Sequence, residues 1–277
     1  MFYDEVNEMK MTGAQAVIEC LKREQVQVVF GYPGGAVLTL YDELYKAKFP
    51  HVLTGHEQGA VHAADGYARA TGKPGVCFAT SGPGVCNMVT GIATANMDSI
   101  PLVVISGQVA TPLIGRDSFQ EADISGITTP ITKHNYLVKN VKELPRVLKE
   151  AFYIATTGRP GPVLVDIAKD VFDTPFEFEY PEEVHLRGYQ GHHVGNDADV
   201  DHAVEAIEKA KRPVILTGGG VVLSNMSDRL KHIVQQMHVP VVTTLMGKGC
   251  VPDTYDAHLG MVGMHGSYAA NMAVTKC

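Results

Sequence analysis

The sequence predicts an α/β protein, in which a parallel-sheet domain is followed by an incomplete Rossmann-like α/β domain. Short apolar runs rich in β-branched residues alternate with amphipathic segments, which is typical of parallel strands joined by crossover helices. The length of 277 residues exceeds one typical domain. A polar stretch with two prolines interrupts the alternation, which then resumes. We therefore expect a first domain at 10–172, a linker at 173–197 and a truncated second domain at 198–277.

The first domain is predicted to open with a capped helix. Thr12 and Gln15 have the spacing of a capping box, and the helical segment 14–24 follows. Strands are expected at 26–32, 51–55, the start of 75–84, 100–107 and 161–168, with helices at 37–47, after Glu57, 85–97 and 144–156. The helix after Glu57 should end at Gly72, since glycine readily adopts the left-handed conformation that closes helices.

The second domain repeats the pattern on a smaller scale. Helices are expected at 201–211, 227–237 and 267–277, and strands at 213–219 and 240–244. The unit stops on a helix after only two clear strands, so we expect it to be cut short. The "GGG" run at 218–220 lacks the full spacing of a dinucleotide fingerprint and is by itself a weak signal.

Composition excludes several classes of function. The net charge is −7 and no basic run is present, which argues against nucleic-acid binding. No apolar run is long enough to span a membrane. The five cysteines are scattered without a CxxC pair, so we expect reduced thiols in a cytoplasmic protein. No metal-ligand spacing, GxSxG or Walker A pattern occurs, which argues against hydrolases and P-loop proteins.

A carboxylate stands where a strand passes into a helix. Glu57 follows the run 51–55, and its neighbours Gln58, Gly59 and Ala60 offer no counter-charge. The Gly-rich loops 31–36 and 80–87 also follow strands, and ligands of open α/β sheets bind at the carboxyl ends of strands. The alternative is an ordinary carboxylate near a helix N-terminus, worth about 0.3–1 kcal/mol.

Six motifs carry a family resemblance over residues 10–277. In order they read "FGYPGGAVL", "HEQGAVHAADGYARATG", "TSGPGVCN", "MDSIPLVVISGQV", "SFQEAD" and "GRPGPVLVDIAKDV". They resemble the thiamine diphosphate-dependent enzymes, and among them the catalytic large subunits of acetohydroxyacid (acetolactate) synthases. The resemblance implies decarboxylation of pyruvate and transfer of the two-carbon fragment to a second 2-ketoacid, in branched-chain amino acid biosynthesis.

The resemblance also assigns roles to particular residues. It implies that Glu57 and Gln120 are catalytic, with Glu57 bonding the N1′ atom of the cofactor's aminopyrimidine ring in a pyrimidine-binding domain. The other implied thiamine diphosphate contacts are Gly35, Thr80, Pro83 and Asn87, and the implied substrate contacts are Ala36, Phe119 and Lys169. The implied contacts to a structural FAD are Arg159, Gly218, Gly219, Gly220, Thr244, Leu245, Met246, Gly263, Met264 and His265.

Some family features differ or are missing. Ala110 and Ala168 replace prolines that are usual in the family, and "VCN" replaces "ATN" at 85–87. The GDG…N motif that binds Mg²⁺ and the diphosphate in the family's third domain is not found, so no metal ligands are expected here. We expect this chain alone to be inactive. The resemblance implies a homodimer or homotetramer, with a regulatory small subunit as a possible partner.

Two alternatives to acetolactate synthesis stay open on sequence grounds. One is another enzyme of the same superfamily, of the pyruvate oxidase or oxalyl-CoA decarboxylase type; glyoxylate carboligase is disfavoured because it lacks the glutamate found at Glu57. The other is a non-catalytic fragment that only pairs with full-length subunits.

Overall fold

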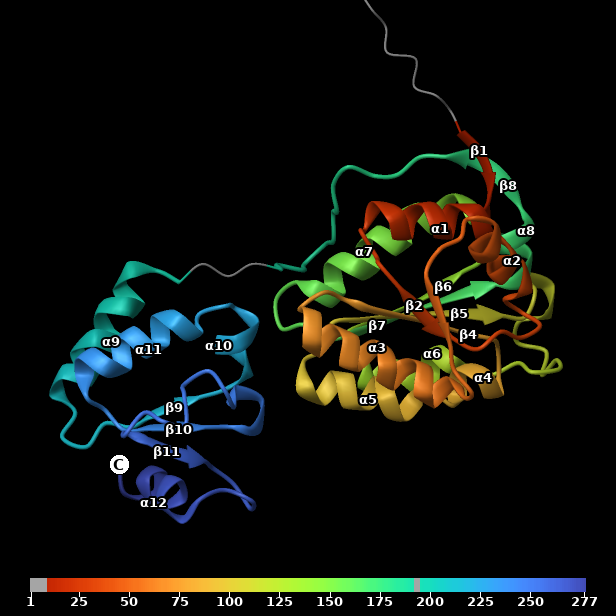
Figure 1. Ribbon diagram of the computed structural model, residues 1–277. Coiled ribbons are helices and arrows are strands. Elements are labelled where there is room, and N and C mark those ends of the chain that lie inside the picture. The colour runs from red at the N-terminus through yellow and green to blue at the C-terminus, as the bar shows by residue number, and fades with distance from the viewer. Residues whose placement is uncertain (1–8, 192–194) are drawn as a thin grey trace, which may run out of the picture. The chain divides into compact units, whose positions relative to one another are not determined.

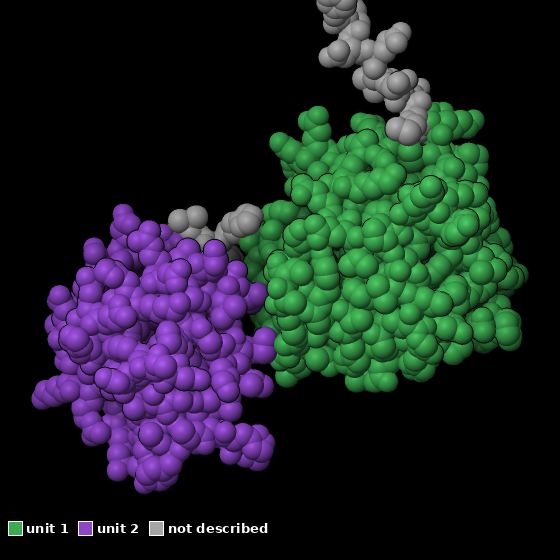
Figure 2. All heavy atoms as spheres, in the orientation of Figure 1, with its two compact units in different colours: residues 1–193 green, residues 194–277 purple. Residues whose placement is uncertain are grey.

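Two compact units make up the chain. Figure 1 shows the computed structural model, which describes residues 9–191 and 195–277. The units comprise residues 1–193 and 194–277, and Figure 2 colours them separately. Each is an α/β layer structure, as the alternating sequence pattern predicts.

The first unit is organised by one six-stranded sheet in which every pairing is parallel. The strand order is β3-β2-β4-β5-β7-β6. The strands are β2 (Val29–Gly31), β3 (His51–Leu53), β4 (Gly75–Ala79), β5 (Leu102–Gln108), β6 (His134–Val138) and β7 (Pro162–Ala168). Five of the six are expected from the sequence. Strand β6 is not, because it lies at the sheet edge, is largely exposed and lacks a continuous apolar run.

Helices cover both faces of this sheet. In Figure 1, α1, α2 and α7 lie over one face and α3, α4, α5 and α6 over the other. Their bounds are α1 (Gly13–Arg23), α2 (Leu38–Lys46), α3 (Glu57–Thr71), α4 (Pro83–Cys86), α5 (Val89–Asp98), α6 (Ile124–Thr128), α7 (Leu144–Thr156) and α8 (Lys169–Asp173). Three 3₁₀ helices connect them: η1 (Thr111–Leu113), η2 (Thr129–Ile131) and η3 (Val141–Glu143).

The local signals act as predicted at two helix ends. Thr12 Oγ1 accepts a bond from the Gln15 amide at 3.4 Å, and the Thr12 amide donates to Gln15 Oε1 at 3.0 Å, which completes the capping box. Helix α3 ends at Gly72, whose φ of 71° is left-handed. The prediction of a single helix at 85–97 is wrong. The segment divides into α4 and α5 at Asn87, whose side chain donates a hydrogen bond to Glu57.

Central strands and helices bury the core that fixes the sheet edge. All seven residues of β5 and all seven of β7 are buried, as expected for strands covered on both faces. Helix α7 contributes Leu148 and Phe152 to the same apolar cluster as α1. The packed layers hold the carboxyl ends of the parallel strands along one edge.

The expected linker at 173–197 is partly structured. Strand β8 (Pro175–Phe178) pairs antiparallel with β1 (Met9–Thr12), so this part of the prediction is wrong. Buried Phe176 and Phe178 alternate with exposed neighbours, which is the two-residue period of a strand. The overall polarity of the segment hides this period in the sequence. Residues 192–194 of the expected linker lie outside the described residues.

The second unit holds a smaller parallel sheet in the order β11-β10-β9. The strands are β9 (Ile215–Thr217), β10 (Val241–Thr243) and β11 (His258–Met261), and the helices are α9 (Asp197–Lys209), α10 (Gly219–Leu223), α11 (Ser227–Met237), η4 (Leu245–Gly247) and α12 (Tyr268–Lys276). The expectation of only two strands is wrong. Strand β11 is short and only half-buried and contains Gly260, so it has no apolar run.

Candidate functional site

The loops around Glu57 meet at a topological switch point of the large sheet. Strands β2 and β4 are neighbours, but the crossover from β2 leads outward to β3, whereas the crossover from β4 leads the other way to β5. Diverging connections of this kind favour a ligand site outside the carboxyl ends of the two strands. Loops 31–36 and 80–82 leave β2 and β4 at this point, and Glu57 begins helix α3 shortly after β3.

The Glu57 side chain is buried at the first position of α3, with 8% of its surface exposed. Its Oε2 atom accepts a hydrogen bond from Asn87 Nδ2 at 3.0 Å. No described residue donates a hydrogen bond to its Oε1 atom. His56 caps the helix through Nδ1, which accepts from the Gln58 amide at 3.1 Å. The carboxylate is thus fixed on one side, and one oxygen is left to accept a further donor.

Thr80 connects the loops after β2 and β4. Its Oγ1 accepts a hydrogen bond from the Ala36 amide at 3.1 Å. A Cβ at Gly84 would lie 2.6 Å from Thr80 Cγ2 and 3.3 Å from Glu57 Oε1, so only glycine fits between them. A Cβ at Gly35, in contrast, would meet no atom within 4 Å. The site therefore combines tight packing behind the carboxylate with open space beside loop 31–36.

A third loop reaches the same place from farther along the chain. Gly82 has a φ of 59°, and a Cβ there would lie 2.5 Å from the carbonyl oxygen of Gln120. Gln120 itself has a φ of 58°, in the left-handed region that few non-glycine residues adopt. Close backbone contact thus joins "TSGPG" to "SFQE", and brings Gln120 to the loops that hold Glu57.

The remaining predicted residues of this edge are solvent-facing. Pro83 starts α4 beside Gly82 and is exposed, and Phe119 is 88% exposed. Lys169 follows β7, at the same carboxyl edge, and is exposed. The predicted thiamine diphosphate and substrate residues are therefore all on one edge of one sheet.

Sequence reasoning missed a buried polar group behind this edge. Asp166 in β7 is 1% exposed, and it accepts hydrogen bonds from Ser106 Oγ at 2.6 Å and Gln108 Nε2 at 2.9 Å. Burial raises the pKa of Asp166 to about 6, against the lowering effect of both bonds. Polar residues inside runs of buried apolar residues, in β5 and β7 alike, were the available signal.

The predicted FAD residues of the second unit also gather at one edge. Loops after β9, β10 and β11 carry "GGG", Thr244–Met246 and Gly263–His265, and these three strands are parallel. A Cβ at Gly218 would lie 3.4 Å from Thr244 Oγ1, and one at Gly219 would lie 3.0 Å from Met246 Cβ. Leu245 and Met264 are exposed by 70% and 92%. Gly219 and Gly220 belong to α10, so part of this run is helical.

Arg159 is the predicted site residue that lies elsewhere. It precedes β7, at the sheet edge opposite Glu57, and its Nε donates to Ser99 Oγ at 2.7 Å. Its Nη2 donates to the carbonyl oxygens of Asn96 and Met97, at the end of α5. Within the first unit, Arg159 therefore acts as a cap on α5.

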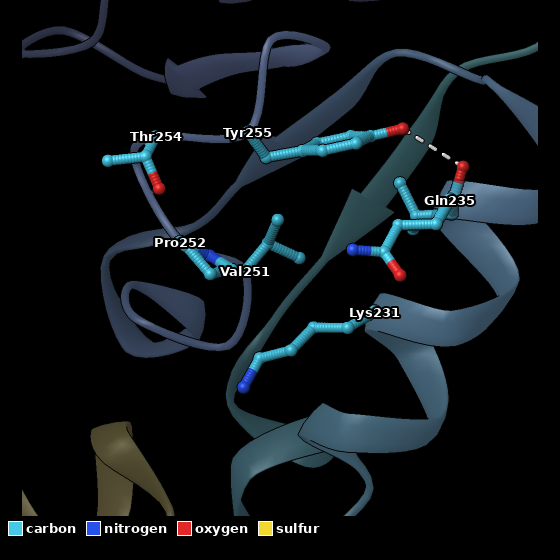
Figure 3. A pocket seen from close by; sticks show the side chains of 7 residues that line it. Lys231, Gln235, Val251, Pro252, Thr254 and Tyr255 are labelled. Carbon is cyan, nitrogen blue, oxygen red and sulfur yellow. Dashed lines mark hydrogen bonds between the residues drawn. The ribbon is translucent and has the colours of Figure 1, made fainter.

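A separate pocket of about 200 Å³ lies in the second unit, between α11 and the segment 251–255 (Figure 3). Tyr255 closes one side through a 2.9 Å hydrogen bond from its hydroxyl to the Val234 carbonyl, and Lys231 and Gln235 point along the other. No predicted site residue lines it. Among the described residues no cluster of His, Cys, Asp or Glu could hold a metal ion, and no helix there is long and apolar enough to cross a bilayer.

Two family models match this chain. Residues 11–127 match the thiamine pyrophosphate enzyme N-terminal TPP binding domain, and residues 200–277 match the thiamine pyrophosphate enzyme central domain. Together they cover more than half of the chain.

Named relatives agree with the family models. The chain is 53% identical over 270 residues to a probable acetolactate synthase large subunit of Methanocaldococcus jannaschii, covering 96% of this chain and 46% of that protein. It is 51% identical to the acetolactate synthase large subunit of Corynebacterium glutamicum, over 96% of this chain and 43% of the relative. It is also 51% identical to an acetolactate synthase of Mycobacterium leprae, over 99% of this chain and 44% of that relative. The chain thus spans a little under half the length of these relatives.

Proposed function

The chain belongs to the thiamine pyrophosphate enzyme family, and from this premise we propose that it is the N-terminal portion of an acetolactate synthase catalytic subunit. The proposed reaction decarboxylates pyruvate and joins the two-carbon fragment to a second 2-ketoacid. The observation that carries the proposal is the buried carboxylate of Glu57 at the switch point, held on one side by Asn87.

The residues at the switch point fit an aminopyrimidine ring. The free Oε1 atom of Glu57 can accept a hydrogen bond from a protonated ring nitrogen, while Asn87 holds Oε2 in place. The open space at Gly35 leaves room for a flat ring beside loop 31–36. Thiamine diphosphate, when bound, supplies the carbanion chemistry that no amino-acid side chain provides.

Glu57 is proposed to hold and return a proton at the ring nitrogen N1′. Only 8% of its surface is exposed, so water competes little for the carboxylate, and a short charge-assisted bond is favoured. The backbone contact between Gly82 and Gln120 supports a role for Gln120 on the reacting side of the same ring. Lys169, Phe119 and Ala36 are proposed to contact substrate.

Further cofactors and partners follow from the family and stay proposals. We propose residues 10–172, together with β8, as the pyrimidine-binding domain, the part of 173–197 that follows β8 as the linker, and 198–277 as an FAD-binding middle domain. Its three loops at one sheet edge suit a nucleotide, because parallel strands bind such ligands there. Arg159 is proposed as a further FAD contact, and the Mg²⁺ ligands are proposed to lie outside this sequence.

Assembly and location are proposed on the same basis. A homodimer or homotetramer and a regulatory small subunit agree with the relatives' names, which describe large subunits. A cytoplasmic location is supported by the five cysteines, all of which are free thiols.

The test is Glu57→Gln in a chimera that joins residues 1–277 to the remaining part of the Methanocaldococcus relative. Acetolactate formation from pyruvate should fall by about 10²-fold or more, because a glutamine cannot accept and return the proton. The matched control is Glu43→Gln on α2, which removes an ion pair with the exposed Lys46 away from the predicted site and should leave the rate unchanged.

Two outcomes would contradict the proposal. Near-normal acetolactate formation by the Glu57→Gln chimera would remove the carboxylate from the chemistry. Acetyl phosphate or another product in place of acetolactate would point to a different enzyme of the superfamily.

A further inference from the structure

We propose that two aspartates, Asp166 and Asp170, clamp the two ends of the loop 111–122 and so position Phe119 and Gln120. Asp166 lies in β7, three residues before Lys169, and Asp170 lies in α8, one residue after it. They are positioning residues, because their side chains accept hydrogen bonds from residues that are not among the predicted cofactor or substrate contacts. The importance of the clamp for catalysis rests on the proposed function, whereas the clamp itself does not.

The Asp166 end acts through an amide. Gln108 Nε2 donates to Asp166 Oδ2 at 2.9 Å and to the Ala122 carbonyl oxygen at 3.0 Å. The Gln108 Oε1 atom is used by the Val109 amide at 2.9 Å, so the orientation of the side-chain amide is fixed. Asp166 therefore holds Gln108 in the one orientation that also ties the far end of the loop to the sheet.

The Asp170 end acts directly. Asp170 Oδ1 accepts hydrogen bonds from the Thr111 amide at 2.8 Å and from Thr111 Oγ1 at 3.1 Å. Thr111 begins the loop and Ala122 ends it, so one short stretch of β7 and α8 holds both ends. A loop held at both ends keeps less conformational freedom than one held at a single end.

The interior of the loop has its own support. Glu121 accepts bonds from the Ser118 amide at 2.9 Å, from Ser118 Oγ at 3.0 Å and from the Gly115 amide. Hydrogen bonds from the Ser118 and Gly115 amides lower the pKa of Glu121, so it stays an acceptor at neutral pH. The loop is thus a rigid turn, and the two aspartates decide where that turn sits against Gly82.

The experiment compares alanine with asparagine at each aspartate in the 277-residue chain. Asparagine keeps an acceptor oxygen for Gln108 or for Thr111, whereas alanine removes it. Hydrogen exchange of the peptide 111–124 is measured without cofactor, with α7 as the internal reference. We expect about fivefold faster exchange in Asp166→Ala and Asp170→Ala, and near-normal exchange in both asparagine variants.

A second reporter and a control separate loop positioning from loss of folding. The chain contains no tryptophan, so Phe119→Trp provides a single tryptophan, excited apart from the 11 tyrosines, whose fluorescence anisotropy should fall in both alanine variants. Asp65→Asn removes the charge of another buried aspartate, which pairs with Arg69 at 2.8 Å, and should leave peptide 111–124 unchanged. Asp170 is exposed, so Asp170→Ala should fold even if Asp166→Ala does not.

Unchanged exchange and anisotropy in Asp170→Ala would overturn the clamp, as would equal acceleration in the alanine and asparagine variants. Because no cofactor or substrate is added, these results are independent of the Glu57→Gln assay. A failed clamp and a failed assignment of activity are therefore distinguishable.

Discussion

The titration of Asp166 gives a prediction with a magnitude. Burial raises its pKa from an ordinary value of 3.8 to about 6. Between these two values the folded chain keeps a proton that the unfolded chain releases, so stability falls as pH rises through this range. The stabilisation is fully present below pH 3.8 and lost above about pH 6. At 1.36 kcal/mol per pH unit the total is about 3 kcal/mol, of which roughly 2 kcal/mol falls between pH 4 and 7.

Asp166→Asn removes this titration and keeps an acceptor for Gln108. The difference in unfolding free energy, variant minus parent, should therefore increase by about 2 kcal/mol from pH 4 to pH 7. Other carboxylates titrate alike in both proteins and cancel in the difference. The assay is urea denaturation by circular dichroism at several pH values, with exchange protection of the β5 and β7 amides reporting the first unit.

A second variant tests the cause of the shift. Ser106 donates to Asp166 and lowers its pKa, so Ser106→Ala should move the loss of stability to higher pH. Parallel stability curves for parent and Asp166→Asn across pH 4–7 would refute the reasoning, because they would mean that the buried carboxyl does not titrate in this range.

Three further predictions concern packing, backbone strain and thiol access. Leu148→Ala should lower the unfolding free energy by about 2–5 kcal/mol, because the Leu148 side chain is fully buried. Leu38 is 60% exposed, so Leu38→Ala should change the unfolding free energy by less than about 0.5 kcal/mol. Equal urea midpoints for the two variants would contradict this prediction. Gly72→Ala should lower the unfolding free energy by about 1–2 kcal/mol through its φ of 71° alone, because an added Cβ there meets no other atom. Gly82→Ala should lower it clearly more, because an added Cβ meets the Gln120 backbone. Thermal unfolding ranks the stabilities of the two variants, and the reverse order would be inconsistent with the contact. An aromatic disulfide reagent at pH 8 should label the exposed Cys277 first, as followed by the absorbance of the released thiolate. The buried thiols of Cys20, Cys77 and Cys250 should react only on unfolding, and burial also raises the pKa of the Cys20 and Cys77 thiols. Rapid labelling of these three cysteines in the folded chain would contradict the packing.

Local sequence signals predicted most of the first unit for an identifiable reason. A strand buried on both faces, such as β5 or β7, needs a mostly apolar run, and α7 has the helical period from its first residue to its last. The failures share a cause. Strands β6, β8 and β11 are short or half-exposed, so pairing with a neighbour decides their conformation, not their own hydrophobicity.

The candidate site divides in the same way. Glu57 and the glycine loops were found from the sequence, because a carboxylate and glycines at strand ends are visible as residue types in order along the chain. The bond from Asn87 to Glu57 was not foreseen, because it depends on the break between α4 and α5. The position of Gln120 depends on close backbone contact with Gly82, which lies 38 residues earlier. Sequence order alone does not specify that contact.

By itself the sequence determined the alternation of strands and helices, the carboxylate at the start of α3 and the family, since each is written in local residue order. Only the tertiary structure decided that Asp166, Gln108 and Ala122 form one chain of hydrogen bonds. These residues lie on separate segments, and hydrogen bonds act over about 3 Å. Their meeting depends on the strand order and register of the sheet, which the packing of its two helical layers fixes.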